Sequence, residues 1–160
     1  MSDLSHLDAE GRARMVDVTG KPATDRIAVA EGVLTCAAET VARAVAGDTP
    51  KGAVMATAEL AGVMGAKRTA ELIPLCHPLP LTRAAVTVSP DPGLPGFRIR
   101  AEVRTHGPTG VEMEALTGVS VAALTLFDML KAIDRTMAIG DIRVVEKRGG
   151  RSGDWSADRA

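Results

Sequence analysis

TRAAVTVSPDPGLPGFRIRAEVRT (residues 82–105) decides the fold. Both ends of this stretch alternate apolar and polar side chains, which is typical of strands with one buried face and one face in water. In the second half, the alternation predicts that Phe97, Ile99, Ala101 and Val103 point inward. The proline- and glycine-rich centre predicts a turn. The stretch therefore predicts an antiparallel hairpin of two strands, residues 82–89 and 97–105.

Outside the hairpin, weaker alternation predicts strands, and helical spacing of apolar residues predicts helices. The expected strands are residues 15–18, 26–35 and 141–146, and the expected helices are residues 37–46, 53–73 and 111–135. Gly47 and Pro74 should end the first two helices. The elements are grouped rather than strictly alternating, so we expect an α+β fold. The whole chain, 1–160, is expected to form one domain with mobile segments at 1–14 and 149–160.

Composition narrows the class of protein. The 160 residues carry a net charge of −1, so no basic excess indicates nucleic-acid binding. No apolar run is expected to be long enough to span a membrane, and the polar N-terminus does not resemble a signal peptide. Two cysteines, Cys36 and Cys76, are too few for a disulfide framework. These features favour a cytoplasmic protein. The chain has no Tyr and only three aromatic residues, and a core of small side chains is often supplemented by contacts between subunits.

Cys76 and His77 lie in the proline-rich segment LCHPLP, residues 75–80. Adjacent residues of an extended segment point to opposite sides, and no further Cys or His stands at ligand spacing, so a zinc site is not supported. A buried cysteine in a rigid turn is the ordinary explanation for Cys76. For His77, a role in packing and a role in binding or acid–base chemistry are equally well supported.

Two pairs of charged residues lie on the last expected helix. Glu112 and Glu114 would offset the helix dipole in its first turn, although carboxylates also accept the neighbouring N–H and amino donors of guanine. Asp128 and Lys131 have the spacing of an i,i+3 ion pair. Their surroundings are apolar, and partial burial would shift their pKa values and make them acid–base candidates. On spacing alone, the structural role is favoured for both pairs.

Several cations stand beside glycines or helix ends, where they could hold phosphate. They are Lys51, Lys67, Arg68, Lys147, Arg148 and Arg151. The segment RGGRSG is not a Walker loop, and no Gly-x-Gly-x-x-Gly motif supports nicotinamide binding. Two hypotheses remain: a cofactor-free enzyme acting on a phosphorylated heterocycle, or a non-catalytic oligomeric scaffold subunit. Convergence of Lys51, His77, Asp128 and Lys131 in one cleft would favour the enzyme.

Taken together, several motifs closely resemble the molybdenum cofactor biosynthesis protein C family of cyclic pyranopterin monophosphate synthases. They are MVDV, PKG around Lys51, KRTAELIPLCHPL, GVEMEALTGVSVAALTLFDMLKA and the tail GG-x-SGD, in the family's order and over nearly the whole chain. Arg151 stands where the family pattern has Lys, and Trp155 where a smaller aromatic is usual. The resemblance implies a lyase that converts a GTP derivative, cyclised between ribose C3′ and guanine C8, to cyclic pyranopterin monophosphate and diphosphate.

The family fold is ferredoxin-like, an antiparallel sheet with helices packed on one face. By position, the resemblance implies that Asp128 and Lys131 are an acid–base pair and that Lys51 is a second catalytic lysine. It implies heterocycle contacts from Leu75, Cys76, His77, Glu112, Met113 and Glu114, and phosphate contacts from Lys67, Lys147 and Arg26. It implies no redox cofactor or protein-bound metal and leaves open whether Mg²⁺ accompanies the triphosphate. It also implies a hexamer, a trimer of dimers with sites at dimer interfaces.

The length of the last helix is relevant to the shared site. A continuous helix would separate Glu114 from Asp128 by about 21 Å, at ~1.5 Å per residue, too far for one small substrate to bridge. A partner chain, or a bend in the helix, would bring the two ends together.

Overall fold

The computed structural model of the chain describes residues 6–157, and residues 1–5 and 158–160, which belong to the two predicted mobile segments, lie outside the described residues. The strands are β1 (Thr24–Thr35), β2 (Leu81–Asp91), β3 (Gly96–Gly107), β4 (Ala138–Arg148) and β5 (Trp155–Ser156). The helices are α1 (Ala38–Ala46), α2 (Val54–Lys67), α3 (Thr69–Leu72) and α4 (Glu112–Leu130).

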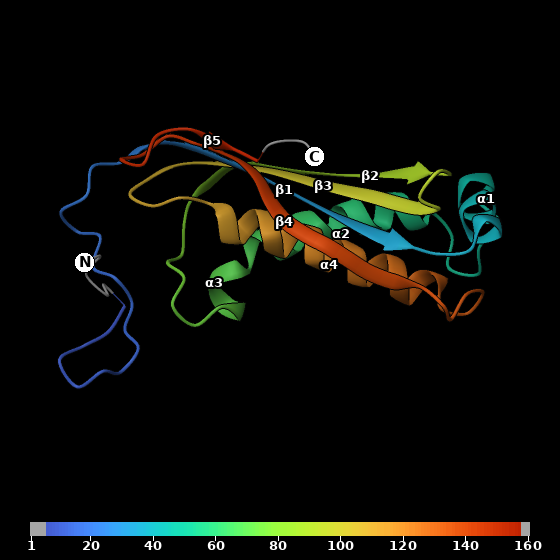
Figure 1. Cartoon of the computed structure of the whole chain (residues 1–160), viewed down its shortest axis with the longest axis horizontal. Helices are drawn as coiled ribbons and strands as arrows, with labels where there is room; N and C mark the ends of the chain where they lie inside the picture. The colour runs from blue at the N-terminus through green and yellow to red at the C-terminus, as the bar shows by residue number, and fades with distance from the viewer. Residues whose placement is uncertain (1–5, 158–160) are drawn as a thin grey trace.

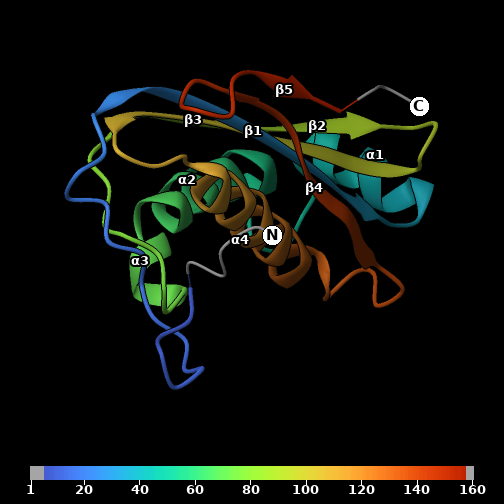
Figure 2. The ribbon, with the colours of Figure 1, turned by 60° about the vertical axis from the view of Figure 1, so that its left-hand side comes forward.

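The strands form one antiparallel sheet in the order β2-β3-β1-β4-β5, with β1 paired along its length to β3 and β4. Helices α2 and α4 cover one face of this sheet, and α1 lies at its end (Figures 1 and 2). Two β-α-β units therefore place their second strands at opposite sides of the central pair, which is the ferredoxin-like arrangement. The predicted α+β class and the predicted hairpin are confirmed.

The core lies between the sheet and the helix layer, and it is built mainly from small and branched side chains. Phe97, Ile99, Ala101 and Val103 are buried in it, as their alternation predicts. The two helices also approach each other closely. A Cβ atom added to Gly65 of α2 would lie 2.6 Å from Val121 Cγ2 of α4, so only glycine fits there. Small residues thus set the distance between α2 and α4.

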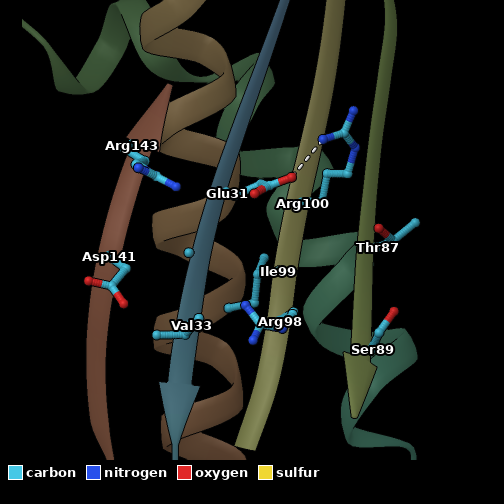
Figure 3. A pocket seen from close by; sticks show the side chains of 10 residues that line it. Glu31, Val33, Thr87, Ser89, Arg98, Ile99, Arg100, Asp141 and Arg143 are labelled. Atoms are coloured by element: carbon cyan, nitrogen blue, oxygen red, sulfur yellow. Dashed lines mark hydrogen bonds and ion pairs between the residues drawn. The ribbon is translucent and has the colours of Figure 1, made fainter. Parts of the chain in front are cut away.

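The other face of the sheet carries charged side chains, which agrees with the predicted wet face of the hairpin. Figure 3 shows Glu31, Arg98, Arg100 and Arg143 on this face, where a hollow of about 550 Å³ lies over the strands. The Arg100 guanidinium donates to the Glu31 carboxylate at 2.7 Å. Most of these charges are neutralised by neighbours on adjacent strands.

One predicted element does not form, and two others differ in extent from the prediction. Residues 15–18 are not a strand. The helix predicted over 53–73 is divided at Arg68, whose backbone leaves helical geometry at φ −107° and ψ 11°. The last long helix ends at Leu130 rather than at residue 135. It stops because Asp134 turns back to accept hydrogen bonds from Ala37 N and Thr40 Oγ1 at the start of α1.

The expectation that no apolar run is long enough to span a membrane is wrong for helix α4. Its 19 residues have a mean hydropathy of 1.4, so by length and composition it could cross a membrane. The helix instead packs against the sheet and α2, and 56% of its apolar window is buried within the protein. More than half of this helix is therefore covered by other parts of the same chain.

Candidate active site

A charged cluster lies at the C-terminal end of α4. Lys131 Nζ donates to Asp128 Oδ1, and Lys51 Nζ donates to Asp128 Oδ2, both at 2.7 Å. Lys51 also donates to the Asp128 carbonyl oxygen at 3.1 Å, which ties the loop before α2 to the helix end. The hydrogen bonds from Lys131 and then from Lys51 lower the pKa of Asp128 to about 2. Asp128 is therefore a permanent carboxylate that holds two ammonium groups side by side.

The three side chains of this cluster are about half-exposed in the single chain, between 44 and 55%. The partial burial expected from the apolar sequence around Asp128 is therefore weaker than predicted. Asp128 lies on the outer side of the last turn of α4, whereas Met129 and Leu130 of the same turn are buried in the core. The cluster remains open to a substrate or to a second chain.

A separate pocket of about 380 Å³ lies at the N-terminal end of α4. Its lining includes all the residues assigned by resemblance to the heterocycle: Leu75, Cys76, His77, Glu112, Met113 and Glu114. Glu114 is buried, and desolvation raises its pKa, with the charge of Glu112 adding to the effect. Burial also raises the pKa of the Cys76 thiol. The pocket therefore combines apolar walls with carboxylates that can accept hydrogen bonds from a donor-rich ring edge.

His77 is held by the chain before β1. Its Nε2 lies 2.7 Å from the carbonyl oxygen of Val16, and because a carbonyl only accepts, Nε2 is the donor. Val16, Val18 and Lys21 also line the pocket. Sequence reasoning did not single out these residues individually, although MVDV was one of the motifs in the family resemblance.

A cationic groove of about 310 Å³ adjoins this pocket and shares four lining residues with it: Lys21, Thr109, Gly110 and Glu112. Its other cations include Arg26, Lys147, Arg148 and Arg151. Lys147 Nζ lies 3.1 Å from Glu112 Oε1, so one carboxylate touches both cavities. A groove lined by so many guanidinium and ammonium groups suits a phosphate chain.

Two glycines allow the C-terminal tail to close over Arg26. Gly149 and Gly150 have φ values of 86° and 83°, and a Cβ atom at Gly150 would overlap the Arg26 guanidinium. Arg26 donates to the Pro108 carbonyl at 3.2 Å, while its buried Nε has no partner among the described residues. The segment RGGRSG, which composition alone favoured as a solvated tail, thus forms one wall of the groove.

The structure separates some residues that were predicted to act together. Lys67 lies at the end of α2 beside a different hollow, which shares only Leu79 with the heterocycle pocket. His77 is not part of the Asp128 cluster, so the predicted convergence of four residues is only partly met within one chain. The cluster and the heterocycle pocket lie at opposite ends of the unbroken helix α4, about 21 Å apart at ~1.5 Å per residue.

Metal binding has no evident site among residues 6–157, where no group of three or more His, Cys, Asp or Glu side chains is placed to hold an ion. Cys76 and His77 are neighbours, but His77 is committed through Nε2 to the Val16 carbonyl. The fold and these cavities define a class of small α+β protein that combines a pocket with a buried carboxylate, an adjoining cationic groove and a separate Lys–Asp–Lys cluster.

Comparison with known proteins gives the family. The chain belongs to the MoaC family, whose model matches residues 15–150. It is 58% identical over 158 residues to the cyclic pyranopterin monophosphate synthase of Dinoroseobacter shibae, covering 99% of this chain and 100% of that protein. Proteins of the same name from Methylobacterium sp. and Brucella ovis are 59% and 58% identical, over 100% and 96% of this chain and 100% and 93% of theirs.

Proposed function

We propose that this chain is a lyase of molybdenum cofactor biosynthesis. It converts (8S)-3′,8-cyclo-7,8-dihydroguanosine 5′-triphosphate to cyclic pyranopterin monophosphate and diphosphate. The observation that carries the proposal is the joined pair of cavities. One has apolar side chains such as Leu75 and Met113 beside buried Glu114, and the other is lined by Arg26, Lys147 and further cations. Such a pair matches a guanine-derived ring that carries a triphosphate.

The binding roles follow from the charges. Glu112 and Glu114 accept hydrogen bonds from the ring N–H and amino groups, which a carboxylate can do in pairs. Lys147 and Arg26 neutralise the phosphates, and they stabilise the negative charge that develops as diphosphate leaves. Cys76 and Leu75 shape the wall beside the ring. We assign Lys67 to the phosphates only if a second chain brings it to the groove.

The chemistry itself consists of proton transfers and one phosphoryl displacement, and we expect it to need no redox cofactor. Asp128 holds the Lys131 and Lys51 ammonium groups in fixed positions. One ammonium can then deliver a proton as the five-membered ring opens, and the neutral amine left behind can take a proton back as the pterin ring closes. The requirement for Mg²⁺ is tested by measuring turnover in the presence of EDTA and after Mg²⁺ is added back.

We further propose that the active site is shared between two chains of a homohexamer. The opposite placement of Asp128 and Glu114 on α4 supports this, because a twofold arrangement brings the C-terminal end of one helix to the N-terminal end of another. Leu60 and Met64 on α2 and Leu124 on α4 are large apolar side chains left exposed on two helices that pack together. Burying such side chains is a common driving force for association.

The test is to supply purified protein with the cyclised GTP derivative and to measure pterin and diphosphate. Product from the wild type, together with a mass near six chains in light scattering, is expected. Mixing Asp128→Asn chains with Glu114→Gln chains should restore part of the activity, because mixed dimers then contain one intact site. An active monomer at micromolar concentration would contradict the shared site, and no turnover by wild type would contradict the lyase. We also expect the protein to be cytoplasmic, which fractionation of cells can test.

A further inference from the structure

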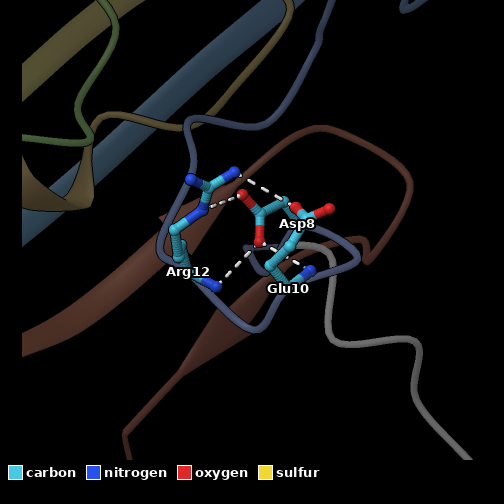
Figure 4. Close-up of polar contacts among 3 residues, drawn as sticks. All are labelled: Asp8, Glu10 and Arg12. Carbon is cyan, nitrogen blue, oxygen red and sulfur yellow. Dashed lines mark hydrogen bonds and ion pairs between the residues drawn. The ribbon is translucent and has the colours of Figure 1, made fainter.

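The chain before β1 forms a small structured loop. Leu7 and Ala13 form an isolated antiparallel bridge, and Arg14 N donates to the His6 carbonyl at 2.9 Å. Figure 4 shows how Asp8 organises the turn between them: its carboxylate accepts hydrogen bonds from Glu10 N at 3.0 Å and from Arg12 N and Nε at 2.8 Å. These contacts hold residues 6–14 in one shape.

This loop is attached to the heterocycle pocket. His77 donates through Nε2 to the Val16 carbonyl, so the residue from the LCHPLP segment fixes the chain that follows the loop. That attachment places the His6 side chain in the lining of the pocket, together with Cys76, His77 and Glu114. The His6 imidazole forms no hydrogen bond with any residue between 6 and 157.

One kind of substrate atom has few candidate partners among the side chains that line the pocket. Glu112 and Glu114 are matched to N–H donors, but a guanine-derived ring also carries a carbonyl oxygen, which a carboxylate cannot bind. His77 has already committed its Nε2–H to Val16, and Lys21 lies at the junction with the phosphate groove. An imidazole offers a donor on a short side chain, and His6 is the one left free.

We propose that His6 is a substrate-contacting residue whose imidazole donates a hydrogen bond to the ring carbonyl oxygen of the heterocycle. The inference rests on the proposed function and adds the N-terminal loop to the active site. Asp8 is then a positioning residue, since it fixes the loop that carries His6.

The chain offers a well-matched control, because it has three histidines and His106 lies exposed on the open face of the sheet, paired with Asp25. His6→Leu and His106→Leu, which both remove the imidazole donor, are compared in steady-state turnover of the cyclised GTP derivative. Loss of one substrate hydrogen bond should lower kcat/KM of His6→Leu by roughly tenfold. His106→Leu should match the wild type, and both variants should have unchanged melting temperatures.

A second measurement does not depend on turnover. Carbethoxylation of the histidines by diethyl pyrocarbonate, read by mass spectrometry, is carried out with and without GTP as a stable probe. GTP should protect His6 and leave His106 modified to the same extent. Equal modification of His6 with and without GTP, or wild-type kcat/KM for His6→Leu, would overturn the proposal. If wild type itself makes no pterin, the lyase assignment fails, and protection by GTP then decides alone whether His6 lines a nucleotide site.

Discussion

Replacing Asp128 with Asn is the sharpest perturbation that the structure suggests. The change keeps the size of the side chain but removes the charge between Lys51 and Lys131, each of which donates to a different carboxylate oxygen at 2.7 Å. An amide offers one acceptor oxygen, and its NH₂ group would face the other ammonium. One lysine therefore loses its partner, and the two positive groups repel each other without a shared counter-charge.

The expected effect falls on turnover rather than on stability. If the cluster performs general acid–base catalysis, loss of its alignment should slow turnover by roughly 10²–10⁴-fold. The melting temperature should change by only a few degrees, because the side chains are about half-exposed and such pairs contribute little. Lys131→Ala should act similarly, and the double variant should be little worse than either single variant, since residues acting as a unit are not additive.

The lowered pKa of Asp128 also predicts how the stability of the fold changes with pH. The folded-state pKa of Asp128, about 2, lies below the ordinary value of 3.8. The contribution of its ion pairs to stability is therefore complete above about pH 3.8, and it is lost as the pH falls toward 2. Asp128 itself stays ionised at neutral pH, so it should not produce a limb in the neutral pH–rate profile.

The assay is product formation under single-turnover conditions, with thermal denaturation of the same preparations. Glu102→Gln is the matched control, because Glu102 also lies between two cations, Arg83 and Arg104, but on the open face of the sheet. It should leave turnover unchanged. If Asp128→Asn keeps near-normal turnover, or loses it only together with its fold, the cluster is structural and the reasoning is refuted.

Three further predictions concern pocket, pH and packing. Cys76→Ser should keep the fold and part of the activity, while stoichiometric zinc lost together with activity on chelation would show that the thiol is a ligand. Asp134→Ala should lower the free energy of unfolding in urea by roughly 1.5–3 kcal/mol, because charged hydrogen bonds are lost. The pKa of Asp134 is lowered to about 2, mainly by the Ala37 backbone N–H, so wild type should lose this contribution as the pH falls from 3.8 toward 2. Gly65→Ala should destabilise the protein, since an overpacking cost of about 1–3 kcal/mol exceeds the ~1 kcal/mol that alanine gains in a helix, and a raised melting temperature would contradict this.

The sequence predicted the sheet and the main helices well because their signals are local. Alternation over residues 97–105 depends only on which face of a strand is buried, and β3 has that pattern. The end of α4 could not be found in this way. Nothing between residues 131 and 135 forbids a helix, and the stop is caused by Asp134 contacting the start of α1, nearly a hundred residues earlier. Strand β5 was missed because a strand of two residues is too short to show an alternating pattern of apolar and polar side chains.

The site was predictable in part for the same reason. Asp128 and Lys131 are close because they share a helix face, but the approach of Lys51 from the loop before α2 is a tertiary contact. The family resemblance supplied Lys51. His6 and Lys21 were missed because they sit in irregular chain, where neither spacing nor composition indicates which cavity a side chain will enter.

The central position of β1 has a consequence for how the protein is made. Its last residue, Thr35, pairs with Gly96 on one side and with Ala138 on the other, so the middle of the sheet joins segments that are far apart in the chain. Such topologies fold slowly, because long loops must close before distant contacts stabilise the chain. During synthesis, β1 leaves the ribosome early and stays without both neighbours until β4 has followed. Pulse-labelled hydrogen exchange during refolding should therefore find the amides of β1 protected late, together with those of β4.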